Sequence, residues 1–440
     1  MDLLDDTNNR TRGRMVFHLP KGQRRTATAA GVIGNIIEWY DFALYGFMAT
    51  ILSTLFFPSH NRTASLLATY GVFAVGFIMR PLGSAIFGWL GDTIGRSRTM
   101  LISVAMMALP TFLLGVLPTY DSVGIWAPIL LIAIRLIQGL SVGGEFSSSV
   151  TYLVETAPTE RRGLSGSWAN VGSMLGMLIG SGVAAAATNF FDPATLHAWG
   201  WRLPFLFGAV LGGIAIALRR HLPRSEHFAK HEADHGETSP LWEALTRDGK
   251  QTLQGTLFAS SYGALFYLTL VYLPNWLTEY TSLDLATAMR ANTAATALMV
   301  VLIPFMGWAS DRLIRRTWLI AIAFGVMALV GPLLQYWMAH GSLEAAITAQ
   351  FLLAILVAVP CGVAPATFVE LFPTEDRLSG YSVAFNVGLG VVGGATPMAA
   401  TWLIDVSGST LAPGFYLLGC ALLGVAILSW MKDRSREPLR

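Results

Sequence analysis

The sequence has few charged residues: 13% of its 440 residues are Asp, Glu, Lys or Arg, whereas soluble domains average about 25%. Hydrophobic residues make up 53% of the chain, and the mean hydropathy is +0.54. A soluble protein of this composition could not cover its surface with polar side chains, so most of the chain requires a lipid environment. Spanning helices would use most of the chain, which excludes a large soluble domain.

Motifs of soluble enzymes are also lacking. The chain has no G-x-x-x-x-G-K-[ST] for ATP binding, no H-E-x-x-H and no G-x-S-x-G. Gly388, Gly390 and Gly393 spell G-x-G-x-x-G, but they fall in an apolar run, where close helix packing explains them better than a dinucleotide does. Cys361 and Cys420 lie in apolar stretches and are interpreted as small buried residues. We therefore expect no enzymatic activity, no cofactor and no metal site.

Apolar runs between polar breakers predict an all-α membrane protein with twelve transmembrane helices. The predicted spans are 28–56, 66–90, 99–117, 124–155, 164–187, 201–219, 251–279, 287–309, 317–338, 345–369, 378–404 and 414–431.

Basic residues are distributed unevenly among the predicted loops. Of the 29 Lys and Arg residues, 24 fall in the tails and the loops of one side, and Arg62 is the one clearly placed in a loop of the other side. The positive-inside rule therefore predicts that both termini are cytoplasmic. The net charge of +2 gives no support to nucleic-acid binding. We expect a multi-pass protein in the inner (plasma) membrane of a bacterium, with the lipid bilayer as its surroundings.

Two motifs occur twice at similar spacing, which indicates an internal repeat. Residues 88–92 match 307–311, and residues 154–162 match 369–377. Parallel six-helix repeats that rock about a midplane site are one architecture of secondary transporters. The predicted divisions are a cytoplasmic N-tail over 1–26, a six-helix half over 27–219, a cytoplasmic linker over 220–250, a second six-helix half over 251–431 and a cytoplasmic C-tail over 432–440.

Few ionisable residues fall inside the predicted spans, where each costs roughly 2.5–3.5 kcal/mol on an insertion scale. The polar ones share one face of each of three helices, which predicts a common aqueous path. These residues are Asn35, Glu38, Asp41 and Tyr45 in span 1, Arg80 in span 2, and Arg135, Gln138 and Glu145 in span 4.

All eight histidines fall in tails or loops, so a proton that crosses the membrane must be carried by a carboxylate. Glu38 and Asp41 are the candidates at suitable depth, because the ionisation of a carboxyl group responds to burial and to a nearby arginine. Glu145 is a further candidate for proton coupling, with a gating or helix-pairing role as the alternative.

Arg135 lies near mid-depth, where a guanidinium can hold a substrate carboxylate. The alternative is a purely structural pair with Glu38 or Asp41. For Arg80, substrate contact competes with snorkelling to the interface or pairing with Asp92. The full predicted substrate-binding set is Arg135, Gln138, Arg80, Tyr45, Asn35, Asn170 and Asn386.

A gate is predicted at the cytoplasmic end, from the acids and arginines of the repeated motifs. Glu155 is expected beside Arg162, and Glu370 beside Arg377. The alternative for Asp92 and Asp311 is that they only fix the topology. The predicted gating residues are Asp92, Arg96, Glu155, Arg162, Asp311, Arg312, Glu370 and Arg377.

The chain resembles the major facilitator superfamily in its loop between spans 2 and 3 and in the second-half copy of that loop. The residues that carry this resemblance are Gly88, Asp92, Gly95, Arg96 and Arg98, with Asp311 and Arg312 in the copy. More narrowly, it is similar to the metabolite:proton symporter family, which includes carriers of citrate, 2-oxoglutarate, shikimate and proline/betaine. The matching segments include 34–35, 38–42, 80–83, 143–145, 199–202 and 370–374. The resemblance implies the major facilitator fold, with two pseudo-symmetric halves of six helices.

The resemblance also implies proton-coupled symport of a small organic acid, such as a di- or tricarboxylate, into the cell by alternating access. Sodium in place of the proton is the alternative that the sequence leaves open. The alternative substrate is a proline- or betaine-type zwitterion, which Trp39, Tyr40 and Tyr45 could contact through cation–π interactions. The short C-tail lacks the long coiled coil of osmosensing betaine carriers, which favours the organic acid. A transporter-derived sensor or scaffold would need an added soluble domain, for which 220–250 is too short. We expect a monomer.

Overall fold

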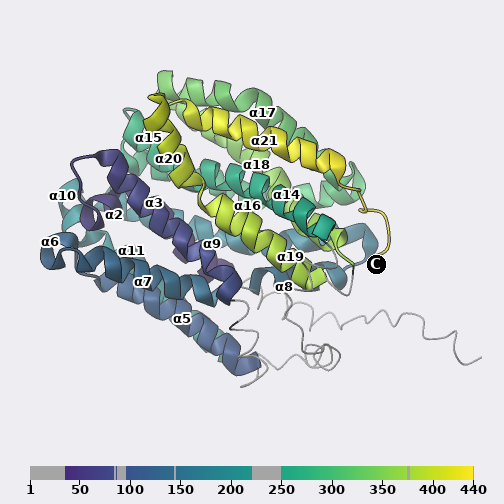
Figure 1. The fold of residues 1–440 in the computed structure, drawn as a ribbon, viewed down its shortest axis with the longest axis horizontal. Coiled ribbons are helices and arrows are strands. Elements are labelled where there is room, and N and C mark those ends of the chain that lie inside the picture. Colours follow the sequence, from purple (N-terminus) through teal and green to yellow (C-terminus); the bar gives the residue numbers. More distant parts are fainter. Residues whose placement is uncertain are drawn as a thin grey trace, which may run out of the picture.

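The computed structural model describes residues 35–83, 86, 96–142, 145–220, 249–373 and 377–439. All regular secondary structure within these ranges is helical, and Figure 1 shows the helices gathered into one bundle. The predicted N-tail and nearly all of the predicted linker lie outside the described residues.

The first half contains the first six predicted spans and short connecting helices. Residues 35–47 and α2 form span 1, and α7 and α8 form span 4. The helices are residues 35–47, α2 (Ala49–Phe56), α3 (Arg62–Ile78), α5 (Arg96–Val116), α6 (Tyr120–Val123), α7 (Trp126–Ser141), α8 (Glu145–Glu155), η1 (Thr159–Arg161), α9 (Arg162–Phe190), α10 (Pro193–Thr195), η2 (Leu196–Gly200) and α11 (Arg202–Arg220).

The second half repeats this arrangement with the last six spans. Span 7 is formed by α14, η4 and α15, and span 11 by α19, η5 and α20. The helices are α14 (Gly249–Tyr267), η4 (Leu268–Tyr272), α15 (Leu273–Tyr280), α16 (Leu285–Arg312), α17 (Arg316–His340), α18 (Leu343–Leu371), α19 (Arg377–Phe385), η5 (Asn386–Gly393), α20 (Thr396–Ser407) and α21 (Ala412–Trp430).

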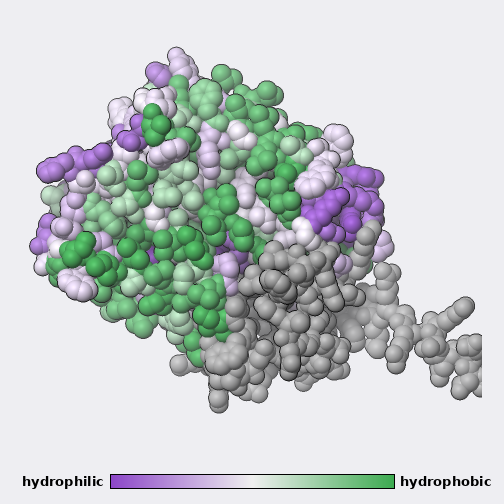
Figure 2. All heavy atoms as spheres, viewed as in Figure 1, coloured by the Kyte–Doolittle hydropathy of each residue, from purple (hydrophilic) through white to green (hydrophobic). Residues whose placement is uncertain are grey.

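The surface of the bundle suits a lipid environment. Eight of the described helices are each long and apolar enough to cross a membrane. The other four predicted spans correspond to residues 35–56, to α5, to α7 with α8, and to α11. Large apolar side chains such as Val301, Leu329 and Leu333 are exposed, and Figure 2 shows hydrophobic residues over the visible flank with hydrophilic residues toward its ends. The predicted fold of twelve membrane-spanning helices is confirmed.

Equivalent helices of the two halves pack in the same way. In the first half α5 packs on α11, and in the second half α17 packs on α21, which pairs spans 3 and 6 and spans 9 and 12. Between the halves, α9 lies along α16, and α3 contacts α20 and η5. The two halves are therefore pseudo-symmetric, and the interior lies along the interface between them.

The G-x-G-x-x-G segment lies in η5, where it packs against α14. A Cβ atom on Gly388 would lie 2.4 Å from the Thr256 carbonyl oxygen, and one on Gly393 would lie 2.9 Å from the Gly263 Cα atom. Because both distances are too short for any side chain, the two helices approach this closely only with glycine at these positions. The motif serves helix packing, as the sequence predicted.

The prediction that every histidine lies in a tail or loop is wrong for His340, which is the last residue of α17. The helix continues past the predicted end of span 9 until Gly341, whose extended backbone ends it. His197 likewise lies in the short helical segment η2. Both side chains are exposed at the ends of the bundle, so neither adds an imidazole to the interior.

Candidate functional site

Four charged side chains from three helices of the first half lie buried in the interior. Glu38 and Asp41 come from the helix over 35–47, Arg80 follows α3, and Arg135 comes from α7. Arg80 Nη2 lies 3.2 Å from Glu38 Oε1, and Arg135 Nη1 lies 3.9 Å from Asp41 Oδ2. With both carboxyl groups ionised, the four charges cancel. We call these four residues the central cluster.

Arg80 is 1% exposed, so its guanidinium does not reach the interface as the snorkelling alternative required. Its predicted alternative partner, Asp92, lies outside the described residues. Arg135 adopts the pair with Asp41 that was the structural alternative to substrate binding, but the 3.9 Å separation exceeds a hydrogen bond.

Asp41 is held by two polar side chains. Thr111 Oγ1, on α5, donates to Asp41 Oδ1 at 2.6 Å, and Gln138 Nε2, on α7, donates to Asp41 Oδ2 at 2.5 Å. Arg135 Nη1 in turn donates to Gln138 Oε1 at 3.0 Å. Gln138 therefore links Arg135 to Asp41. Sequence reasoning missed Thr111, because a single threonine in an apolar helix gives no periodic signal.

Aromatic rings surround the two arginines. The Arg80 guanidinium carbon lies 4.7 Å from the centroid of Phe42 and 4.5 Å from that of Phe77. The Arg135 guanidinium carbon lies 4.7 Å from the centroid of the same Phe42 ring and 4.5 Å from that of Tyr45. Cation–π attraction over these faces compensates part of the lost hydration of both guanidinium groups.

Aromatic residues of the second half complete this environment. Tyr267 stacks on Trp39 with centroids 6.4 Å apart, and Phe266 meets Trp39 edge-on at 5.5 Å. Tyr267 also meets Phe77 at 5.4 Å. The central cluster is thus enclosed by rings from both halves, and a ligand there would touch both halves at once.

Several buried donors at this site have no hydrogen-bond partner among the described residues. They include Arg135 Nε and Nη2, Trp39 Nε1 and the Tyr267 hydroxyl. An unpaired buried donor costs about 1–3 kcal/mol, so these groups favour a ligand that supplies acceptors. The site can therefore hold a small molecule that combines a carboxylate with a group suited to aromatic faces.

The three predicted asparagines lie in contacts between or within helices. Asn35 Nδ2 donates to the Ala169 carbonyl at 3.3 Å, and Asn170 Nδ2 donates to the Cys361 carbonyl at 2.6 Å. Asn386 Nδ2 donates to a serine hydroxyl one turn earlier, at 3.2 Å. None of these three hydrogen bonds involves a residue of the central cluster. The Tyr45 hydroxyl likewise donates to a backbone carbonyl of α3, while its ring contacts Arg135.

The repeated motifs meet at the predicted cytoplasmic end, and they pair across the halves. Arg377 Nη1 lies 2.5 Å from Glu155 Oε1, and Arg162 Nη1 lies 3.6 Å from Glu370 Oε1. Glu155 and Arg162 belong to the first half, whereas Glu370 and Arg377 belong to the second. The expectation that each acid lies beside the arginine of its own motif is therefore not what the structure shows.

Asp311 closes the same end in a different way. Its two carboxylate oxygens accept the backbone N–H groups of Gly163 and Leu164 at 2.8 and 2.9 Å, at the start of α9. A carboxylate at a helix N-terminus satisfies free N–H groups and complements the helix dipole. Arg316 Nη2 lies 2.7 Å from Asp311, whereas the predicted gating residue Arg312 is exposed.

Arg316 is a gating candidate that sequence reasoning did not select. It also contacts Glu370, with Nη1 at 2.6 Å from Oε1, and it is 1% exposed. Its position in the basic loop before span 9 was the available sequence signal, but that loop was used only to predict the orientation of the chain in the membrane. Of the other predicted gating and coupling residues, Asp92 lies outside the described residues, and Arg96 and Glu145 are described only as the first residues of α5 and α8.

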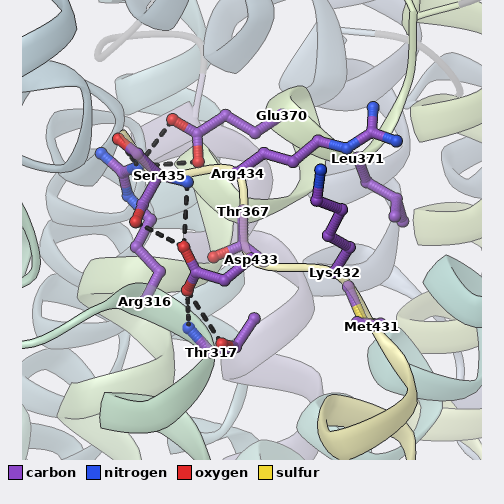
Figure 3. Close-up of a pocket in the computed structure, with 10 residues that line it drawn as sticks. All are labelled: Arg316, Thr317, Thr367, Glu370, Leu371, Met431, Lys432, Asp433, Arg434 and Ser435. Atoms are coloured by element: carbon purple, nitrogen blue, oxygen red, sulfur yellow. Dashed lines mark hydrogen bonds and ion pairs between the residues drawn. The ribbon is translucent and has the colours of Figure 1, made fainter. Parts of the chain in front are cut away.

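The segment after α21 folds back over this end, as Figure 3 shows. Asp433 Oδ2 accepts from the Thr317 backbone N–H at 2.9 Å and from its hydroxyl at 2.8 Å, which caps α17. The carbonyl oxygens of Ser435 and Glu437 accept from Arg316 and Arg162 at 3.2 and 2.9 Å. The segment thereby contacts helices of both halves.

The opposite end of the bundle is also held together across the halves. Arg62, at the start of α3, donates to both carboxylate oxygens of Glu279 on α15, at 2.9 and 3.0 Å. Nearby, Asn275 Nδ2 donates to the Gly46 carbonyl at 2.8 Å. Contacts therefore join the halves at both ends, with the central cluster buried between them.

Comparison with known proteins is consistent with this architecture. Residues 27–261 match the family model described as sugar (and other) transporter, and residues 255–440 match that of the major facilitator superfamily. The chain is 32% identical over 439 residues to the proline/betaine transporter of Escherichia coli K12, covering 97% of this chain and 87% of that protein. It is 30% identical over 419 residues to the citrate-proton symporter of Klebsiella pneumoniae, covering 95% and 94%. A D-xylose-proton symporter structure shares the fold, with a TM-score of 0.74 and 17% identity over 95% of this chain and 100% of that one.

The fold and the buried charged site define a membrane transporter built from two six-helix halves. The chain belongs to the major facilitator superfamily. The resemblance to the metabolite:proton symporter family is confirmed by the relatives, which are transporters, and the protein is a transporter rather than an enzyme.

Proposed function

We propose that this chain is a proton-coupled symporter of a small zwitterion of the proline or betaine type. The observation that carries this proposal is the balance of the central cluster, in which two arginines face two carboxylates inside a ring of aromatic side chains. A substrate without net charge enters such a site without adding charge to the membrane interior, where charge is costly.

The two ends of a zwitterion match two parts of the site. Arg135 would hold the carboxylate, because Nε and Nη2 are unpaired within the described structure and can donate in parallel. Trp39, Phe266 and Tyr267 would contact the ammonium end, since aromatic faces attract cations and accept methyl groups. A carrier of such a zwitterion therefore needs no charged side chain in addition to those of the central cluster.

The named relatives support the zwitterion over the organic acid that the sequence favoured, because proline/betaine transporters are prominent among them. A small carboxylate remains the second candidate. Two buried arginines favour it, and one relative is a citrate-proton symporter.

Coupling would depend on Glu38 or Asp41, the acids of the central cluster. Protonation of either leaves the cluster with one net positive charge, which favours a substrate carboxylate beside Arg135. In this proposal the protein is a monomer in a bacterial inner membrane, with both termini cytoplasmic. Separation of the halves at one end, and then at the other, would give alternating access to the cluster.

Uptake into proteoliposomes tests this function directly. We expect labelled L-proline or glycine betaine to accumulate when the outside is acidic and sodium is absent, and an uncoupler to abolish the accumulation. Liposomes without protein are the control. Accumulation of labelled citrate alone would favour the second candidate, and uptake that requires sodium or ignores the pH gradient would contradict proton symport.

A further inference from the structure

The side chain of Gln138 is hydrogen-bonded to both Arg135 and Asp41 and so connects them. A guanidinium only donates hydrogen bonds and an ionised carboxylate only accepts them, whereas an amide does each at a different atom. Gln138 Oε1 accepts from Arg135 at 3.0 Å, and Gln138 Nε2 donates to Asp41 at 2.5 Å. This chemistry fixes the orientation of the amide, because a flipped amide would face Arg135 with its NH₂ group.

Thr111 holds the other oxygen of Asp41 and has a choice of acceptors. Its hydroxyl lies 2.6 Å from Asp41 Oδ1 and 2.9 Å from the Met107 carbonyl oxygen, and it has one proton to donate. Gln138 Nε2 lies 3.2 Å from the same hydroxyl oxygen. While Asp41 is ionised, the Thr111 proton is best placed on Oδ1, because hydrogen bonds to charged acceptors are roughly twice as strong as neutral ones.

A proton that reaches Asp41 Oδ1 reverses this bond without leaving a group unpaired. The carboxyl O–H then donates to Thr111 Oγ1, and the Thr111 O–H turns to the Met107 carbonyl. Asp41 Oδ2 becomes an uncharged acceptor, which weakens its bond from Gln138. Arg135 then faces one negative charge fewer and can take up a substrate carboxylate.

The other charged and titratable groups near Asp41 have partners of their own or are already part of this network. Within the part of the chain that the structure describes, Arg135, on α7, is the charged side chain that pairs with Asp41 from a neighbouring helix. On the helix of Asp41 itself, Glu38 is paired with Arg80, and Tyr40 donates its hydroxyl to the Pro204 carbonyl at 2.5 Å.

We propose that Thr111 and Gln138 are positioning residues that couple protonation of Asp41 to substrate binding at Arg135. Thr111 accepts the hydrogen bond of the protonated carboxyl group. Gln138, which is bonded to both Asp41 and Arg135, links the loss of negative charge on Asp41 to the guanidinium of Arg135. This inference rests on the proposed function, since it requires proton symport. It adds the two side chains that connect the proton site at Asp41 with the substrate site at Arg135.

The test uses variants that keep side-chain volume and remove hydrogen bonding. Thr111→Val and Gln138→Met are measured in proteoliposomes with labelled L-proline and labelled citrate as probes. In the wild type, the KM of the transported probe should fall as the outer pH drops from about 8 to 6. In both variants we expect this dependence to flatten and the accumulation ratio to fall about tenfold, within the usual range of coupling between two sites.

Two controls separate coupling from packing. Thr111→Ser keeps the hydroxyl and should restore the pH dependence that Thr111→Val loses. Thr188→Val removes a hydroxyl whose hydrogen bonds to described residues stay within its own helix, at the Ala184 and Ala185 carbonyls, and this variant should behave as the wild type.

The outcomes distinguish this inference from the proposed function. If the wild type shows no proton-driven uptake of either probe, the proposed function and the inference both fail. If the wild type couples and both variants keep its accumulation ratio and its pH dependence, only the inference fails. If Thr111→Val does not reach the membrane, Gln138→Met alone decides in the same way.

Discussion

Arg377 and Glu155 form an ion pair across the two halves of the protein, with 2.5 Å between Nη1 and Oε1. The pair is matched by Arg162 and Glu370, which occupy the equivalent positions of the other motif copy and lie 3.6 Å apart. The internal repeat therefore gives two reciprocal contacts, and both must break before the halves separate at the predicted cytoplasmic end. Each acid is 215 positions from its counterpart in the other copy.

Exchange of charge across the halves tests this gate. We expect Glu155→Gln and Arg377→Gln to favour opening at the predicted cytoplasmic end, and the reversed pair Glu155→Arg with Arg377→Glu to restore closure. The readout is alkylation of Ser310→Cys, because Ser310 is 5% exposed and lies against Gly163 of the other half. Alkylation should be about threefold faster in each single variant, because losing one partly exposed ion pair should destabilise the closed state by about 0.7 kcal/mol.

Arg62→Gln provides the matched control, because it breaks the pair with Glu279 at the opposite end. Alkylation of Ser310→Cys should then become slower, since opening at that end competes with opening at the predicted cytoplasmic end. Faster alkylation in all three single variants would indicate general loosening of the fold and would contradict a gate.

Arg135→Lys tests the substrate site. The ammonium of lysine cannot reproduce two parallel hydrogen bonds to a carboxylate, so the apparent affinity for the transported substrate should fall about ten- to a hundredfold, or roughly 1.4–2.8 kcal/mol. Competition between labelled and unlabelled substrate measures this change. Arg312→Lys, at an exposed position, is the control and should leave affinity unchanged. An unaltered affinity in Arg135→Lys would assign that arginine a structural role only.

Glu38→Gln and Asp41→Asn identify the proton carrier. At least one of them should abolish accumulation driven by a pH gradient while counterflow of labelled substrate persists, because exchange needs no net proton movement. The comparison of accumulation with counterflow in the same vesicles is the measurement. If both variants still concentrate substrate, a residue outside the central cluster carries the proton.

Asp433→Ala tests the cap on α17. Burial raises the pKa of Asp433, but hydrogen bonds from Ser435 and Thr317 outweigh it and hold the pKa below its ordinary value of 3.8. A lowered folded-state pKa contributes stability above the unfolded-state pKa, and that contribution is lost only as the pH falls through the folded-state pKa. We therefore expect a loss of about 1 kcal/mol of unfolding free energy, typical of a lost helix cap, that is equal at pH 5.5 and pH 8.

Thermal unfolding of the purified protein at the two pH values measures this effect. Arg436→Ala removes an exposed charge from the same segment and should leave stability unchanged. A loss of stability that differs between pH 5.5 and pH 8 would show that Asp433 titrates in that interval, contrary to its hydrogen bonding.

Composition and the repeated motifs were sufficient to predict the twelve spans and the division into halves. A bilayer requires about 20 apolar residues per helix, so the positions of apolar runs along the chain are enough to predict the spans. The repeat of residues 154–162 at 369–377 fixed the pseudo-symmetry in the same direct way. The polar faces that contain Asp41 and Arg135 were also predictable, because helical periodicity determines which residues of one helix share a side.

Which of these faces meet could not be predicted, because it depends on how the helices pack. Arg80 pairs with Glu38, Thr111 supports Asp41, and Arg316 rather than the exposed Arg312 contacts Glu370. Periodicity assigns a residue to a face of its own helix, but the partner depends on how helices far apart in the sequence rotate and pack against each other. That choice is made by close contacts such as Gly388 against Thr256, which no single helix contains.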